Sequence, residues 1–97
     1  MRLTPEVRLT KNPDIQWKMI EEEAVLVDQD ELQILHLNEV ATEVWNLIDG
    51  KRTVNEIITQ MLSVFEVKRK TAEKDILDFL QKLIKIEAIT NIKEVIL

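Results

Sequence analysis

The sequence predicts a small α+β domain in which β-strands come first and α-helices follow. Between residues 15 and 37, apolar residues alternate with polar ones or form short runs, a pattern typical of strands. From Asn38 onward, apolar residues recur at helical spacing, a pattern typical of helices packed against a core. A chain of 97 residues with 45% hydrophobic residues is long enough for one domain with one core. We therefore expect residues 1–97 to form a single domain.

Three segments are predicted to form the strands. Residues 15–20 (IQWKMI) alternate between apolar and polar, as in a half-buried strand. Residues 24–27 (AVLV) are a continuous apolar run, consistent with a strand covered on both faces. The polar segment 28–31 (DQDE) reads as a turn, and residues 32–37 (LQILHL) then form the return strand of a hairpin.

The two ends of the chain are expected to differ from this middle part. Residues 1–14 contain both prolines, Pro5 and Pro13. Because proline fixes one backbone angle and has no N–H to donate, we expect an extended, loosely held arm here. Residues 38–90 are expected to be the helical part, and the tail 88–97 (AITNIKEVIL) is expected to finish the last helix and add a short strand.

Start and stop signals divide the helical part into three helices. Asn38 is placed to cap the first helix. Gly50 is expected to stop it, because glycine adopts the left-handed conformation past a helix end at the least cost. Thr53 and Glu56 form a T-x-x-E capping box for the second helix. Thr71 is expected to cap the third.

Residues that carry chemistry are scarce in this chain. There is no cysteine, one glycine and one histidine, His36. The lack of cysteine excludes disulfides, thiolate metal sites and a cysteine nucleophile, and a single glycine leaves no glycine-rich loop for a phosphate. The acidic segments 21–23 and 28–31 lack the pattern of a calcium-binding loop and read as solvated turns. The sequence thus predicts a protein that is not an enzyme and holds no metal or cofactor.

Charge and hydropathy narrow the range of partners. The net charge of −5 disfavours nucleic acid, since binding to a phosphate backbone needs a positive surface. No apolar run approaches the roughly 20 residues that span a bilayer. The N-terminal residues also lack the apolar core of a signal peptide. We expect no membrane partner and a cytoplasmic location.

Two features favour a binding role. The apolar positions of the third helix cover roughly 180° of its circumference, whereas packing against one core commonly uses nearer about 100°. Either this helix is simply well buried, or it has a second contact with the sheet, another chain or a ligand. In addition, strand 32–37 has no lysine or proline to block pairing at its edge, so a peptide strand could add there.

The order and spacing of several short motifs resemble those of the PqqD family. The motifs run through residues 15–90 and are Trp17, Leu37-Asn38, Asp49-Gly50, Arg52-Thr53-Val54, Ile57, Leu62 and the DILDFL segment Asp75–Leu80. This family comprises the precursor-peptide chaperones of pyrroloquinoline quinone synthesis and their relatives, the recognition domains of ribosomal peptide modification. The peptide and the pathway are not identified by these motifs.

The resemblance implies a small three-stranded antiparallel sheet followed by three helices in a winged-helix-like arrangement. It implies that a leader peptide adds as a strand to the edge of the third strand and packs against the third helix, while a modifying enzyme, typically a radical S-adenosylmethionine protein, acts on the core peptide. On this sequence the peptide-binding positions would be Gln33, Ile34, Leu35, His36, Asp75, Phe79, Lys82 and Ile86. The opposite edge of the third helix, with Leu77, Gln81 and Ile84, is an alternative.

Two rival functions fit the same element order. A winged-helix DNA-binding regulator would place a basic helix in the major groove. The second helix, residues 54–65, has no lysine or arginine, and the lysines of the third are offset by acidic residues, so neither looks like a recognition helix. A structural subunit that buries the wide face of the third helix in a homo-oligomer is the other possibility.

Overall fold

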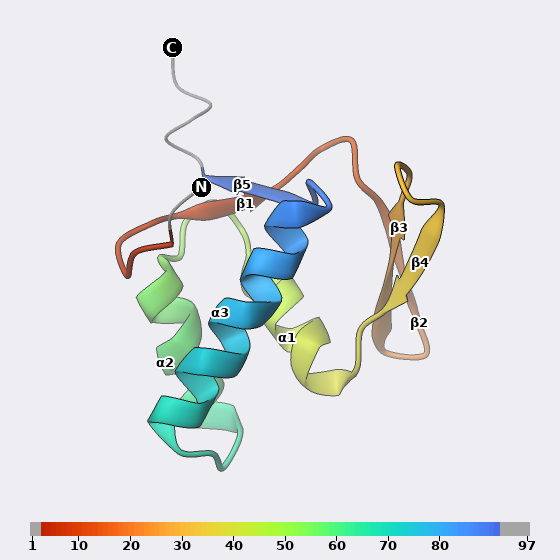
Figure 1. Cartoon of the computed structure of the whole chain (residues 1–97). Helices are drawn as coiled ribbons and strands as arrows, with labels where there is room; N and C mark the ends of the chain where they lie inside the picture. Colours follow the sequence, from red (N-terminus) through yellow and green to blue (C-terminus); the bar gives the residue numbers. More distant parts are fainter. Residues whose placement is uncertain (1–2, 92–97) are drawn as a thin grey trace.

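The computed structural model describes residues 3–91. Strands lie at both ends of the chain and helices between them (Figure 1). The elements in order are β1 (Leu9–Lys11), β2 (Gln16–Ile20), β3 (Glu23–Asp28), β4 (Gln33–His36), α1 (Glu39–Leu47), α2 (Val54–Val64), α3 (Arg69–Lys85) and β5 (Ile89–Asn91). The prediction of an α+β fold with three helices is confirmed.

The strands form two separate antiparallel sheets. One has three strands in the order β2-β3-β4 and matches the three-stranded antiparallel sheet that the resemblance implied, and the other pairs β1 with β5. The second sheet was not predicted apart from the short C-terminal strand β5, and residues 92–97 of that predicted tail lie outside the described part of the chain. In the three-stranded sheet, β3 is central and its residues Ala24, Val25 and Leu26 are buried. The burial of Ala24 and Leu26 agrees with the prediction for one face, but on the other face Val27 is only half-buried beside the exposed Ile34, so the strand is not fully covered there.

The N-terminal arm differs from its prediction. It was expected to be loosely held, but Val7 and Leu9 are buried in the core. The carbonyl oxygens of both residues accept backbone hydrogen bonds from the chain around the start of α2, Val7 from Val54 N–H at 2.9 Å and Leu9 from Gly50 N–H at 2.8 Å. The arm also ends in β1, which lies beside β5 (Figure 1). Both prolines lie in turns, closed by hydrogen bonds of 3.1 Å from Val7 N–H to the Thr4 carbonyl and from Ile15 N–H to the Asn12 carbonyl, and the apolar side chains fix the arm to the body.

Two of the three helix starts are capped by the residues that the sequence predicted. Asn38 caps α1 by accepting a hydrogen bond from Ala41 N–H at 2.9 Å. Thr53 and Glu56 form the complete capping box of α2. The prediction for α3 was wrong, because the helix begins at Arg69 with Lys68 at the N-cap and no side-chain cap bond, so Thr71 lies inside the first turn.

Gly50 has the left-handed conformation that was expected, with φ of 79°. The helix ends earlier than predicted, at Leu47 with Ile48 as its C-cap, so Gly50 belongs to the following turn. Asp49 closes the same turn, since its carboxylate accepts from the backbone N–H groups of Lys51 and Arg52, each at 2.9 Å. These bonds lower the pKa of the Asp49 carboxyl below its ordinary value of 3.8.

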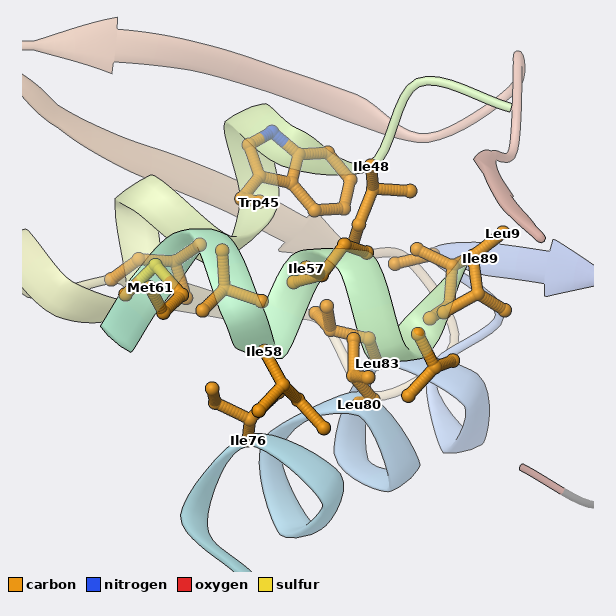
Figure 2. Close-up of a cluster of buried hydrophobic side chains, with 14 of the residues drawn as sticks. Leu9, Trp45, Ile48, Ile57, Ile58, Met61, Ile76, Leu80, Leu83 and Ile89 are labelled. Atoms are coloured by element: carbon orange, nitrogen blue, oxygen red, sulfur yellow. The ribbon is translucent and has the colours of Figure 1, made fainter. Parts of the chain in front are cut away.

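The core lies between the helices and the second sheet. Figure 2 shows α2 with Trp45 of α1 on one side and the side chains of Ile76, Leu80 and Leu83 of α3 on the other. Leu9 of β1 and Ile89 of β5 close one end of this cluster. The second sheet is therefore part of the core and not an appendage.

A cluster of two tryptophans and a lysine joins the three-stranded sheet to the helices. The rings of Trp17 in β2 and Trp45 in α1 meet edge to face with centroids 5.4 Å apart. The ammonium group of Lys11 lies over both rings, at 5.6 and 4.9 Å from their centroids, and donates to the carbonyl oxygen of Ile48 at 2.7 Å. Burial lowers the pKa of Lys11, and the nearby Asp49 carboxylate offsets part of this.

Candidate functional site

Strand β4 has one free edge, and the register shows which backbone groups face it. The N–H of Leu37 donates to the carbonyl oxygen of Ala24 at 2.9 Å, so this pair is bonded across the two strands. In an antiparallel ladder, bonded and non-bonded pairs alternate. Leu35 and Gln33 lie two and four residues before Leu37, so they also direct their backbone N–H and C=O groups toward β3. Ile34 and His36 therefore direct their N–H and C=O groups toward the open edge.

The last rung of this ladder is completed by a side chain of α1. Thr42 is buried, and its Oγ1 accepts from Ala24 N–H at 3.0 Å and donates to the carbonyl oxygen of Leu37 at 3.2 Å. In a regular antiparallel pair these two backbone groups bond to each other directly. The inserted hydroxyl ties the ends of β3 and β4 to α1 and thereby fixes where the free edge lies.

A hollow of about 350 Å³ lies between β4 and the C-terminal part of α3. Gln33 and Leu35 line it from the strand, and Lys82, Lys85 and Ile86 line it from the helix and its C-cap. Asp28, Asp30 and Glu31 of the β3–β4 turn close it at one end. Figure 1 shows this turn at the same end of the molecule as the C-terminal end of α3. We call this space the β4–α3 groove.

A second, shallower hollow continues along α3. It has a volume of about 520 Å³ and is lined by Phe79, Lys82, Lys85, Asp78 and Gln81. Lys82 and Lys85 line both hollows, so the two form adjacent parts of one helix surface. Phe79 is half-buried against the core and supplies the aromatic part of this surface.

The residues expected at the site therefore separate into three groups. Gln33, Leu35, Lys82 and Ile86 meet around the groove, and Phe79 lies next to it. Ile34 and His36 have their side chains on the outer face of the sheet, where Ile34 is 64% exposed, and reach the groove edge only through their backbone. Asp75 lines neither hollow.

The opposite edge of α3 is partly occupied by the chain itself. Leu77 lines a separate small hollow together with Leu3, Pro5 and Ile58, which belong to the N-terminal arm and to α2. Gln81 faces the hollow beside Phe79. The arm thus accounts for part of the wide apolar arc of α3, and the Phe79–Ile86 edge is the one that adjoins β4.

The two lysines beside the groove have no side-chain partners in the described part of the chain. Elsewhere on α3, Arg69 pairs with Glu73 at 2.7 Å and Lys74 pairs with Asp78 at 3.2 Å. Within residues 3–91, neither Lys82 nor Lys85 has an ion pair or a side-chain hydrogen bond. The Asp28 carboxylate accepts from the N–H groups of Asp30 and Glu31, which holds the turn in shape.

Neither a group of metal ligands nor a membrane-spanning helix occurs among the described residues. Over residues 3–91, no three histidine, cysteine, aspartate or glutamate residues are grouped so that they could hold a metal ion. Over the same range, no helix has the length and apolar composition needed to cross a bilayer. The geometry of the site is that of an open strand edge beside a helix.

Sequence reasoning did not include Lys85 or the three acidic turn residues among the site residues. Lys85 follows Lys82 by three positions, which is helical spacing for one face, and this signal was available. The turn residues were assigned only to a solvated hairpin turn. Their position beside the groove depends on how the hairpin is placed relative to α3, which no local pattern in the sequence encodes.

Comparisons with known proteins give a family and a fold. A family model described as coenzyme PQQ synthesis protein D (PqqD) matches residues 23–89. No curated protein matches the chain. The structure resembles that of TbiB1 in complex with the TbiA(beta) leader peptide, at 25% identity and a TM-score of 0.72, over 82% of this chain and 93% of that one. It also shares its fold with lasso peptide synthetase B1 complexed with the leader peptide, at 20% identity and a TM-score of 0.72, over 86% and 98% of the two chains.

Proposed function

The chain belongs to the PqqD family, and from that membership we propose that it is a non-catalytic module that binds the leader region of a ribosomally made precursor peptide. The leader would add as a strand to the free edge of β4 and place alternate side chains in the β4–α3 groove. Backbone hydrogen bonds would supply affinity and the groove would supply selectivity. The bound peptide would then be presented to a modifying enzyme, for which a radical S-adenosylmethionine protein is our candidate.

The observation that carries this proposal is the free edge of β4 beside the groove. Ile34 and His36 each offer a donor and an acceptor at that edge, and a hollow of about 350 Å³ lies next to it. An extended peptide needs both features, a row of backbone partners and room for its side chains on one face. The likeness to TbiB1, whose structure contains a leader peptide, supports the same assignment.

No catalytic group is needed for this role. A protein that binds the leader and also contacts the enzyme raises the local concentration of the substrate peptide at the active site. The gain depends on holding the leader long enough for modification, and a set of backbone bonds with one or two side-chain contacts is sufficient for that. This part of the proposal is tested by adding the module to the enzyme and measuring the rate of peptide modification.

Proline variants test the strand addition directly. Random peptides about twelve residues long, enough for one strand with flanks, are displayed on phage and selected on the wild-type protein. We expect Ile34→Pro to abolish binding of the selected peptides, because proline removes a donor at the open edge and its ring obstructs the incoming strand. Met19→Pro is the matched control, since the same alternation of bonds places the N–H of Met19 on the outer edge of β2.

Circular dichroism shows whether each proline variant is folded before binding is measured by calorimetry. The proposal predicts that Met19→Pro keeps its affinity while Ile34→Pro loses it. Full affinity in a folded Ile34→Pro variant would place the peptide site elsewhere. If selection on the wild-type protein enriched no peptide, the proposed peptide-binding role itself would be contradicted.

A further inference from the structure

Side chains of both charges line the β4–α3 groove. Lys82 and Lys85 line it from α3, and Asp30 and Glu31 lie with Asp28 at the turn that closes one end. All five residues line the same hollow, together with the apolar side chains of Leu35 and Ile86. A peptide strand that enters this space meets an apolar centre, a cationic wall and an anionic end.

The lysine pair has a property that separates it from the other charges of α3. Arg69 and Lys74 each bind a carboxylate four residues further along the helix, at 2.7 and 3.2 Å. Lys82 and Lys85 have Ile86 and Ile89 four residues further along, and Asp78, the carboxylate four residues before Lys82, is bound to Lys74 instead. In the part of the chain that the structure describes, both ammonium groups are exposed and unpaired beside the groove.

The acidic end restricts where a negative group of the ligand can lie. Asp28 is buried, and its carboxylate already accepts from the N–H groups of Asp30 and Glu31, so these three residues form one fixed turn. An acidic ligand side chain near this turn would be repelled, whereas one near Lys82 and Lys85 would be attracted. Charge therefore distinguishes between registers of the same peptide along β4.

We propose that the peptide recognised by this groove carries an acidic side chain that pairs with Lys82 and Lys85, two residues away from an apolar side chain that packs against Leu35 and Ile86. The spacing of two follows from strand geometry, because alternate residues of an added strand face the same side. This inference rests on the proposed function. It adds the chemical class of the recognised segment and the residues that read it.

The experiment compares selections from the same random phage library on three proteins. The wild-type protein is expected to enrich peptides with aspartate or glutamate two positions from an apolar residue. The double variant Lys82→Glu/Lys85→Glu is expected to enrich lysine or arginine at that place instead. The matched control Lys68→Glu/Lys70→Glu changes the net charge equally at the other end of the helix, away from the groove, and is expected to select the same peptides as the wild type.

Binding constants measured by calorimetry complete the test. A peptide selected on the wild type is expected to bind the Lys82→Glu/Lys85→Glu protein about 3- to 20-fold more weakly, and added salt is expected to reduce the difference. The proposal is overturned if peptides that require an intact Ile34 edge show no acidic preference, or if the charge reversal leaves their affinity unchanged. Strand addition itself would be contradicted if selection on the wild-type protein enriched no peptide. It would also be contradicted if the selected peptides bound Ile34→Pro as tightly as they bind the wild type.

Discussion

Thr42 shows how a single buried hydroxyl can determine the shape of a strand edge. It lies in α1, yet it completes the hydrogen bonding between the end of β4 and the start of β3. Without it, the N–H of Ala24 would be buried and unsatisfied, since Ala24 has no exposed surface. The position of the free edge of β4 therefore depends on a residue that cannot itself contact a ligand there.

We predict that Thr42→Val lowers the free energy of unfolding by about 1–3 kcal/mol, because a buried donor loses its acceptor while the side-chain volume is kept. Thr42→Ser is the control, since it keeps the hydroxyl and loses one methyl group, at a cost nearer about 0.8 kcal/mol. Urea denaturation followed by circular dichroism measures both. If valine and serine are equally well tolerated, the hydroxyl bridge does not stabilise the sheet.

At the level of helices and strands, the sequence predicted what is encoded locally. The caps at Asn38 and Thr53 are correct because each bond joins residues three positions apart. Segment 21–23 was read as a turn, but its backbone conformation gave no such signal, since Glu21 and Glu22 have positive φ angles of 49° and 70° where glycine or asparagine is usual. The burial of Leu9 likewise had no local signal, because it depends on contacts with segments far along the chain.

The same distinction applies to the candidate site. The open strand and the third helix were predictable as elements from hydrophobic period and from the absence of blocking residues on strand 32–37. That the two lie side by side was implied only by the resemblance to the PqqD family. The choice between the two edges of α3 was left open, since it depends on the arm lying against Leu77. That arrangement is tertiary, and a helical period cannot encode it.

The loop turn at Asp49 and the first turn of α2 also predict how stability changes with acid. Hydrogen bonds from the Thr53 N–H and hydroxyl lower the pKa of Glu56 below its ordinary value of 4.5, as the turn bonds do for Asp49. In the unfolded chain both groups take up protons at higher pH than in the folded chain. Their stabilisation is therefore complete above their ordinary pKa values and is lost as the pH falls through the lowered ones.

We expect the free energy of unfolding to fall between about pH 5 and pH 2. The double variant Asp49→Asn/Glu56→Gln should show a weaker dependence on pH over this range, because amides accept the same bonds and do not titrate. Urea denaturation at each pH provides the measurement. An unchanged pH dependence in the double variant would assign the effect to other carboxylates.

At the level of the whole molecule, the arm and β5 join the two ends of the described chain. The family match covers residues 23–89 and so leaves out β1 and β2. Yet Leu9 of β1 is completely buried, and β1 pairs with β5 along its full length. The stable unit is therefore larger than the segment that the family model matches.

We predict that Leu9→Ala destabilises the protein by about 2–5 kcal/mol, the usual range for a large-to-small change in a core. Thr10→Ala, at the neighbouring position of β1, should cost less because Thr10 is only half-buried. Thermal denaturation compares the two. Peptide affinity of the folded fraction should be unchanged in both variants, since neither residue lines the β4–α3 groove. Similar melting temperatures for the two variants would show that the arm contributes little to stability.

The tryptophan pair at the junction of the sheet and the helices also gives the protein a built-in optical probe. The chain has two tryptophans and no tyrosine, so its near-ultraviolet fluorescence comes from Trp17 and Trp45. Their rings are in contact, one fully buried and the other 38% exposed. Emission from this chain thus reports on one place, and a shift to longer wavelength during unfolding marks the moment when water enters between the three-stranded sheet and α1.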